Sequence, residues 1–135
     1  MSFIVKKHSK EEFYEVYNSW IENHGMPLNC ISIEVLPANI FVCYNGEIPI
    51  YAIPFWFTDS RIAIASMVIS NKKINYKKRI GGLEFLLEHI IKYAKTKKIL
   101  SIFSPTKNDK FIESLLKVGF VQGDEDSSQY FKKVA

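Results

Sequence analysis

The sequence has few of the residues that build metal centres or disulfide frameworks. It contains two cysteines and three histidines in 135 residues. The cysteines, Cys30 and Cys43, are thirteen residues apart and form no CxxC pair. This pattern predicts reduced, partly buried thiols in a cytoplasmic protein and no metal site, with a disulfide between the two cysteines as the minor alternative.

Long apolar runs are also missing. The richest run, Phe41 to Phe57, is broken by the polar residues 45–47, so no segment approaches the roughly 18 apolar residues of a transmembrane helix. Lys6 and Lys7 arrive too early for the apolar core of a signal peptide. We therefore expect no membrane partner and a cytoplasmic location.

The composition is that of one globular domain. Hydrophobic residues make up 47% of the chain, aromatic residues 14% and charged residues 24%. Such a chain buries enough apolar surface to fold, which excludes intrinsic disorder. Its length leaves no room for two domains, so we expect a single domain over residues 1–135.

The net charge of +4 is unevenly distributed. Residues 71–98 hold nine Lys and Arg against two Glu, a net charge of +7, and the other residues sum to −3. Such a segment either faces an anion or is a solvated helix face. Aromatic residues accompany the positive charge, but no RNA- or DNA-binding motif is present, so we do not favour a nucleic-acid partner.

Hydrophobic periodicity and turn signals divide the chain into alternating strands and helices. The patterns predict strands at 3–7, 40–44, 48–57, 61–70, 99–103, 120–121 and 129–134. They predict helices at 10–24, 83–95 and 105–118. This order predicts a mixed sheet with helices on its faces, an α/β (α+β) domain.

Local signals support several of these elements. Ser9 and Glu12 have the spacing of a capping box, and the Asn45-Gly46 dipeptide is a strong hairpin signal. Pro49 and Pro54 within the strand 48–57 indicate an edge, a bulge or a bend. The strand 61–70 is apolar on both faces, so we expect it to be continuous, central and covered from both sides.

A basic loop at 71–82 follows this strand and leads into a helix through two glycines. Lys77, Lys78 and Arg79 precede Gly81 and Gly82. Free N–H groups at a helix start, together with the helix dipole, favour an anion at this position. A plain loop with a glycine bend and solvated lysines is the alternative, and the sequence leaves both open.

Two segments resemble motifs of the GNAT superfamily of N-acetyltransferases. That family's phosphate loop reads [Arg/Gln]-x-x-Gly-x-[Gly/Ala], and the register here is Lys78-Arg79-Ile80-Gly81-Gly82-Leu83, with Leu83 at the last, small position. The second motif, Asn-x-x-Ala-x-x-Leu-Tyr-x-x-x-Gly-Phe, is matched from Asn108 to Phe120. In this second match Phe111, Ser114 and Leu115 replace Ala, Leu and Tyr.

The resemblance implies a GNAT-like domain, with a mixed, mostly antiparallel sheet of about 6–7 strands flanked by about 3–4 helices. It also implies acetyl-CoA as cofactor and no metal. The cofactor would be bound by the strand residues Met67, Val68 and Ile69, by the loop residues Lys78, Arg79, Ile80, Gly81, Gly82 and Leu83, and by Asn108.

The implied function is transfer of an acetyl group from acetyl-CoA to an amine of a small molecule or a protein. The family's usual tyrosine acid is replaced by Leu115, and no carboxylate base lies in the strand 61–70. The catalytic residues therefore stay unassigned. Ser66, His89 and four tyrosines are general acid–base candidates, although each is more commonly a packing or surface residue. These tyrosines are Tyr51, Tyr76, Tyr93 and Tyr130.

A catalytically inactive GNAT-like protein is the alternative that these departures favour. It would act through a protein partner or self-association. Degenerate GNAT-like proteins occur in tailed phages, and the Ile-, Lys- and Asn-rich composition suits an AT-rich genome. Such a chain would be a virion or host-interaction protein. The aromatic residues of 55–57 are candidates for a protein contact. The acidic turn 124–126 could instead attract a cationic acceptor.

Overall fold

The computed structural model describes residues 2–124, 130, 132 and 134, and its centre is one mixed sheet. The six strands are β1 (Phe3–Ser9), β2 (Asn39–Asn45), β3 (Ile48–Phe57), β4 (Ile62–Ala65), β5 (Ile69–Ser70) and β6 (Ser101–Phe103). The helices are α1 (Lys10–Asn23), α2 (Tyr76–Arg79), α3 (Gly82–Thr96) and α4 (Asp109–Lys117), with a 3-10 turn at Ile33–Val35. The predicted fold class is confirmed.

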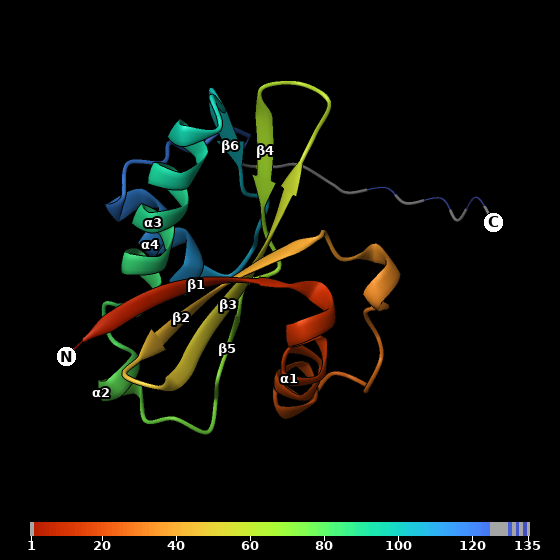
Figure 1. The fold of residues 1–135 in the computed structure, drawn as a ribbon, viewed down its shortest axis with the longest axis vertical. Coiled ribbons are helices and arrows are strands. Elements are labelled where there is room, and N and C mark those ends of the chain that lie inside the picture. The colour runs from red at the N-terminus through yellow and green to blue at the C-terminus, as the bar shows by residue number, and fades with distance from the viewer. Residues whose placement is uncertain (1, 125–129, 131, 133, 135) are drawn as a thin grey trace.

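The strands are ordered β1-β2-β3-β4-β6, and β5 also pairs with β3. All pairs are antiparallel except β4 with β6, which are parallel and are joined through α3. Helix α1 covers one face of the sheet, and α3 and α4 cover the other (Figure 1). None of the helices in the described part of the chain is long and apolar enough to cross a membrane.

Two apolar clusters hold the layers together, one on each face of the sheet. Under α3 and α4 the side chains of Phe41, Ile53 and Phe55 are at most 1% exposed. Under α1, Tyr17 and Ile21 pack on Ile40 and Val42 with the same burial. Neighbouring strand residues therefore point to opposite clusters, as the period of two requires.

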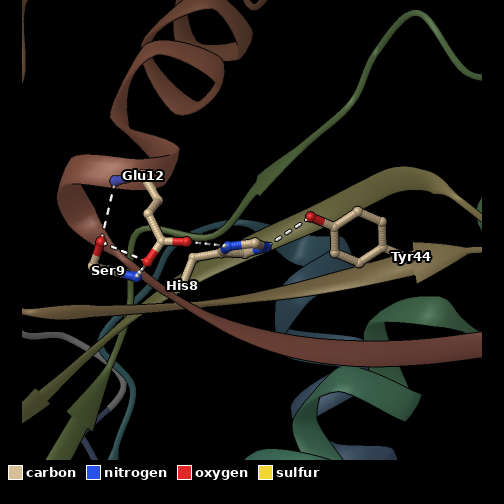
Figure 2. Close-up of polar contacts among 4 residues, drawn as sticks. All are labelled: His8, Ser9, Glu12 and Tyr44. Carbon is tan, nitrogen blue, oxygen red and sulfur yellow. Dashed lines mark hydrogen bonds and ion pairs between the residues drawn. The ribbon is translucent and has the colours of Figure 1, made fainter.

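The junction of β1 and α1 is fixed by the predicted capping box (Figure 2). The Glu12 N–H donates to Ser9 Oγ at 3.2 Å, and the Ser9 N–H donates to Glu12 Oε1 at 3.3 Å. The other Glu12 oxygen lies 3.4 Å from His8 Nδ1, and His8 Nε2 lies 2.7 Å from the Tyr44 hydroxyl. A chain of polar contacts thus ties the helix start to β2.

Of the three predicted alternatives for the two prolines of β3, an edge, a bulge or a bend, the structure has a bulge opposite Pro49, and Pro54 lies at a change of strand partner. A register shift between Cys43 and Tyr44 brings Tyr44 opposite Pro49. The Pro54 carbonyl accepts from the Ser66 N–H at 3.4 Å. The polar groups of Pro54 therefore face the edge of β3 at the point where its partner changes from β5 to β4. A proline costs no ladder hydrogen bond at such a point.

The predicted continuous strand 61–70 is interrupted at residues 66–68. Met67 has φ of 61°, a left-handed conformation that ends the pleat. Tyr17 on α1 donates to the Met67 carbonyl at 2.7 Å, a tertiary contact that the strand pattern does not reveal. The expectation of cover on both faces is also wrong, because Ala63 is buried under α3 whereas Ile62 is 47% exposed.

Three other boundaries differ from the prediction. The loop 71–82 contains the short helix α2. Helix α4 begins at Asp109 instead of Pro105, because the Asn108 side chain accepts from the Phe111 N–H at 3.0 Å and caps the helix there. Residues 120–121 form no strand. The predicted strand 129–134 and the acidic turn 124–126 lie largely outside the described residues.

Candidate functional site

A cleft opens where β4 and β6 separate. The two strands pair from Ile62 opposite Ser101 to Ile64 opposite Phe103, and beyond that point the chains diverge. The resulting cavity has a volume of about 660 Å³. It is lined by Ser66, Met67 and Val68 on one side, by Pro105, Thr106, Asn108 and Phe111 on the other, and by Tyr130.

The wall at residues 66–68 carries unused backbone donors. The Met67 carbonyl is occupied by Tyr17, and the Ser66 N–H by Pro54. Within the part of the chain that the structure describes, the N–H groups of Met67 and Val68 donate no hydrogen bond. Met67 is 37% exposed, so solvent reaches this wall, and its N–H groups are open to an acceptor from outside the chain.

The opposite wall combines a helix cap with an apolar floor. Asn108 uses its side-chain oxygen to cap α4, which leaves its amide nitrogen free of hydrogen bonds within the described residues. Phe111 is 1% exposed, so the bulk that replaces the family's alanine lies mainly in the core. Ser66 Oγ donates to the Pro105 carbonyl at 3.0 Å and ties the two walls together.

The two glycines before α3 are explained by packing and backbone conformation. Gly81 has φ of 82°, and no side chain caps the helix at this residue. A Cβ at Gly82 would lie 2.7 Å from Ile50 Cδ1, so Gly82 is required for the contact between helix and sheet. Leu83 is 7% exposed and belongs to the core.

The basic residues of this loop point to two different places. Lys78 lines a second cavity of about 280 Å³, with Asn45, Ile48, Ile50 and Ile74. Arg79 donates from Nε to the Ile74 carbonyl at 3.1 Å, and its guanidinium lies over the ring of Tyr76 at 5.7 Å. Neither residue lines the cleft between β4 and β6.

The structure therefore brings together only part of the predicted cofactor-binding set. Met67, Val68 and Asn108 line the cleft. Ile69 is buried opposite Ala52, and the residues Lys78, Arg79, Ile80, Gly81, Gly82 and Leu83 lie outside the lining. The sequence analysis missed Tyr17, because its position in the apolar stripe of α1 predicts a core residue and conceals its hydroxyl contact.

Few titratable groups line the cleft. Of the acid–base candidates only Ser66 and Tyr130 do so, and no carboxylate or histidine is among the described lining residues. Burial raises the pKa of Tyr51. The pKa of His89 is lowered mainly by burial and to a smaller extent by the charge of Lys92. Neither residue lines the cavity. Leu115, at the position of the family's tyrosine, is 6% exposed and packs in the core.

The described residues hold no candidate metal centre. Among the described residues no three His, Cys, Asp or Glu side chains are grouped closely enough to hold an ion. The two cysteines are free thiols, Cys30 exposed and Cys43 buried. Burial raises the pKa of Cys43 to about 12, which keeps this thiol protonated and chemically inert at neutral pH.

Comparison with known proteins identifies the fold. No family model and no curated protein matches the sequence. An aminoglycoside acetyltransferase from an uncultured soil metagenomic sample, solved with sisomicin, matches with a TM-score of 0.72 at 8% identity, over 97% of this chain and 96% of that chain. The aminoglycoside N-acetyltransferase AAC(6')-Iy, solved with CoA, matches with a TM-score of 0.66 at 11% identity, over 99% and 96% of the two chains.

A GNAT-family acetyltransferase from Streptococcus pneumoniae also matches, with a TM-score of 0.64 at 11% identity, over 98% of this chain and 99% of that one. These likenesses extend over nearly the whole of each chain. The chain therefore has the GNAT fold.

Proposed function

We propose that this GNAT-fold chain is an N-acyltransferase that moves an acetyl group from acetyl-CoA to an amine. The observation that carries the proposal is the pair of unused N–H groups at Met67 and Val68, in a wall of the cleft where β4 and β6 separate. The likeness to an acetyltransferase solved with CoA supports the choice of cofactor.

The residues of the cleft suit the amide-bearing arm of CoA. The cleft volume of about 660 Å³ lies within the range of small-molecule sites. The arm would take the place of a missing strand between β5 and the segment after β6, with its amides bonding to the backbone wall. Met67, Val68, Pro105 and Phe111 supply the apolar surroundings that exclude water from the arm.

When bound, acetyl-CoA supplies a thioester carbonyl that an amine can attack directly. The N–H groups of Met67 and Val68 are available to stabilise negative charge that develops on a carbonyl oxygen held at this wall. Because no carboxylate or histidine is among the described lining residues, we assign the proton of the amine to water, and the thiolate that leaves when the carbon–sulfur bond breaks would take up a proton from water.

The acceptor is proposed as an amine of a small molecule or of a protein. The aminoglycoside acetyltransferase that was solved with sisomicin illustrates the first class. We place the reaction in the cytoplasm, in keeping with the two free thiols.

Calorimetry with acetyl-CoA and CoA tests the proposal first, and release of the CoA thiol with a panel of amines tests turnover. The exposed Cys30 would react with a thiol reagent, so the assay uses the Cys30→Ser variant. We expect micromolar binding of both ligands and amine-dependent thiol release. Absence of binding at millimolar ligand would exclude the proposed function.

A GNAT-fold binding or assembly protein is the second candidate. It is favoured by the lack of an acid–base group other than Tyr130 and Ser66 among the described cleft residues and by exposed apolar residues at the β4–β6 end of the sheet. Ile62, Leu100 and Phe103 are 47%, 75% and 59% exposed. A virion or host-interaction role belongs to this candidate. Acetyl-CoA binding without turnover, together with self-association, would support it over the enzyme.

A further inference from the structure

Two cations from different elements meet on one aromatic ring near the cleft. The ring belongs to Tyr76 on α2, which is 50% exposed. The Arg79 guanidinium lies 5.7 Å from the ring centroid, and the Lys110 ammonium of α4 lies 5.1 Å from it. We call Tyr76, Arg79 and Lys110 the Tyr76 clamp. A cation over a ring face is held by the ring's quadrupole, so both cations are attracted to the same tyrosine.

Within the described residues no carboxylate forms a salt bridge with the cations of the clamp. Salt bridges among the described residues join His8 to Glu12 and Lys117 to Glu84 and Glu113, and none involves Arg79 or Lys110. Arg79 donates only from Nε, to the Ile74 carbonyl, so its two terminal amino groups make no hydrogen bond within the described part. Two unpaired cations held at one ring favour a ligand with more than one negative charge.

The clamp adjoins the cleft through α4. Asn108, the N-cap of α4, lines the cleft, and Lys110 follows it by two residues. The packing of Gly82 on Ile50 restricts a side chain at that position and leaves the backbone N–H groups at the start of α3 available. An anion at this end of the cleft would meet the clamp in addition to those groups.

We propose that the Tyr76 clamp binds the phosphates of the cofactor, with Lys110 and Arg79 as the anion contacts and Tyr76 as the residue that positions them. This inference rests on the proposed function, because it takes acetyl-CoA as the ligand of the cleft. It adds to that function two residues, Lys110 and Tyr76, from outside the expected binding set.

Calorimetry with CoA and with pantetheine, which lacks the nucleotide and its phosphates, tests the inference. Lys110→Ala is expected to weaken CoA binding about tenfold, the loss of one charge-assisted contact, and to leave pantetheine binding unchanged. Lys95→Ala is the matched control, because Lys95 lies in the last turn of α3, roughly 20 Å of helix away from Gly82. Tyr76→Leu removes the aromatic face and should weaken CoA binding in the same direction as Lys110→Ala, with pantetheine binding unchanged.

The outcomes separate the inference from the proposed function. If CoA binds the unmodified chain and Lys110→Ala binds it equally well, the clamp has no role in binding and only the inference fails. Equal weakening of CoA and pantetheine by Lys110→Ala would indicate a structural effect on the cleft and would also overturn the inference. If neither CoA nor acetyl-CoA binds the unmodified chain, the proposed function fails and the inference fails with it.

Discussion

The two halves of the sheet differ in how completely their groups are covered. In the half formed by β1, β2 and the first part of β3, α1 packs on one face and α3 on the other, and Phe41 and Val42 are fully buried. In the half formed by the end of β3, β4 and β6, α3 covers one face only. There Trp56, Ile64 and Phe103 are cross-strand neighbours, and Phe103 is 59% exposed.

Polar groups show the same contrast. At the β1–α1 junction Ser9, His8 and Glu12 satisfy one another and reach Tyr44 (Figure 2). At the β4–β6 end the N–H groups of Met67 and Val68 have no partner within the described residues. We therefore expect the first half to contribute most of the stability and the second half to bind the ligand, since binding sites are commonly drawn from less completely packed regions.

The largest expected effect is a loss of stability from a core truncation in the covered half. Phe41→Ala removes a ring that packs 5.7 Å from Phe55 and 5.0 Å from Tyr93, between ring centroids. We expect it to lower the free energy of unfolding by about 3–5 kcal/mol, as measured by urea denaturation. The matched change Phe103→Ala, in the open half, should cost less than about 0.5 kcal/mol. Equal losses would refute the contrast between the halves.

Gly82→Ala distinguishes packing from ligand contact at the start of α3. The added Cβ would meet Ile50 Cδ1 at 2.7 Å, and Ile50 is fully buried, so we expect a loss of about 1–3 kcal/mol in thermal or urea unfolding. CoA affinity of the folded variant should change less than twofold. A stable variant with strongly reduced CoA affinity would instead place the phosphates at this glycine.

Ser9→Ala tests the polar junction of the covered half. Loss of the cap should lower the free energy of unfolding by about 1 kcal/mol. The pKa of Glu12 lies below its usual value, mainly because of hydrogen bonds from Ser9 and to a smaller extent because of the contact with His8. The stability from this carboxylate is present above the unfolded-state pKa and is lost as the pH falls through the lower, folded value. In Ser9→Ala this acid-dependent loss should shrink; an unchanged pH dependence of the unfolding midpoint would count against the assignment.

The smallest expected effect concerns the thiols. Cys30 is exposed, and Cys43 lies buried in β2 with a pKa raised to about 12 by burial. Titration of the native chain with a thiol reagent at neutral pH should therefore modify one cysteine, and unfolding should release the second. Cys30→Ser should leave no reactive thiol in the native state. Rapid modification of both thiols would show that the covered half opens readily.

The sequence predicts most of the fold, because its signals are local. The Ser9–Glu12 spacing, the apolar stripes of α1 and α3 and the Asn45-Gly46 turn each fix an element without reference to the rest of the chain. The interruption at Met67 was not predictable in this way. It is accompanied by a hydrogen bond from the Tyr17 hydroxyl, fifty residues earlier in the chain, and an alternation of apolar residues carries no sign of that contact.

The candidate site was predicted only in part for a similar reason. Met67, Val68 and Asn108 were implied by the resemblance to GNAT motifs, and they line the cleft. The Gly81-Gly82 pair matched a phosphate loop, but one glycine can serve a turn, a close packing contact or a ligand, and the pattern does not distinguish these uses. Lys110 was missed because its neighbour Tyr76 is far away in the sequence.

Amide hydrogen exchange at Met67 and Val68, with and without acetyl-CoA, tests the central claim most directly. Both amides lack a partner within the described residues, so they should exchange rapidly in the free protein. Saturation with acetyl-CoA should slow them at least tenfold and leave the amides of β1 and β2 unchanged. Unchanged exchange at Met67 and Val68 under saturating ligand would contradict the claim that this wall of the cleft receives the cofactor.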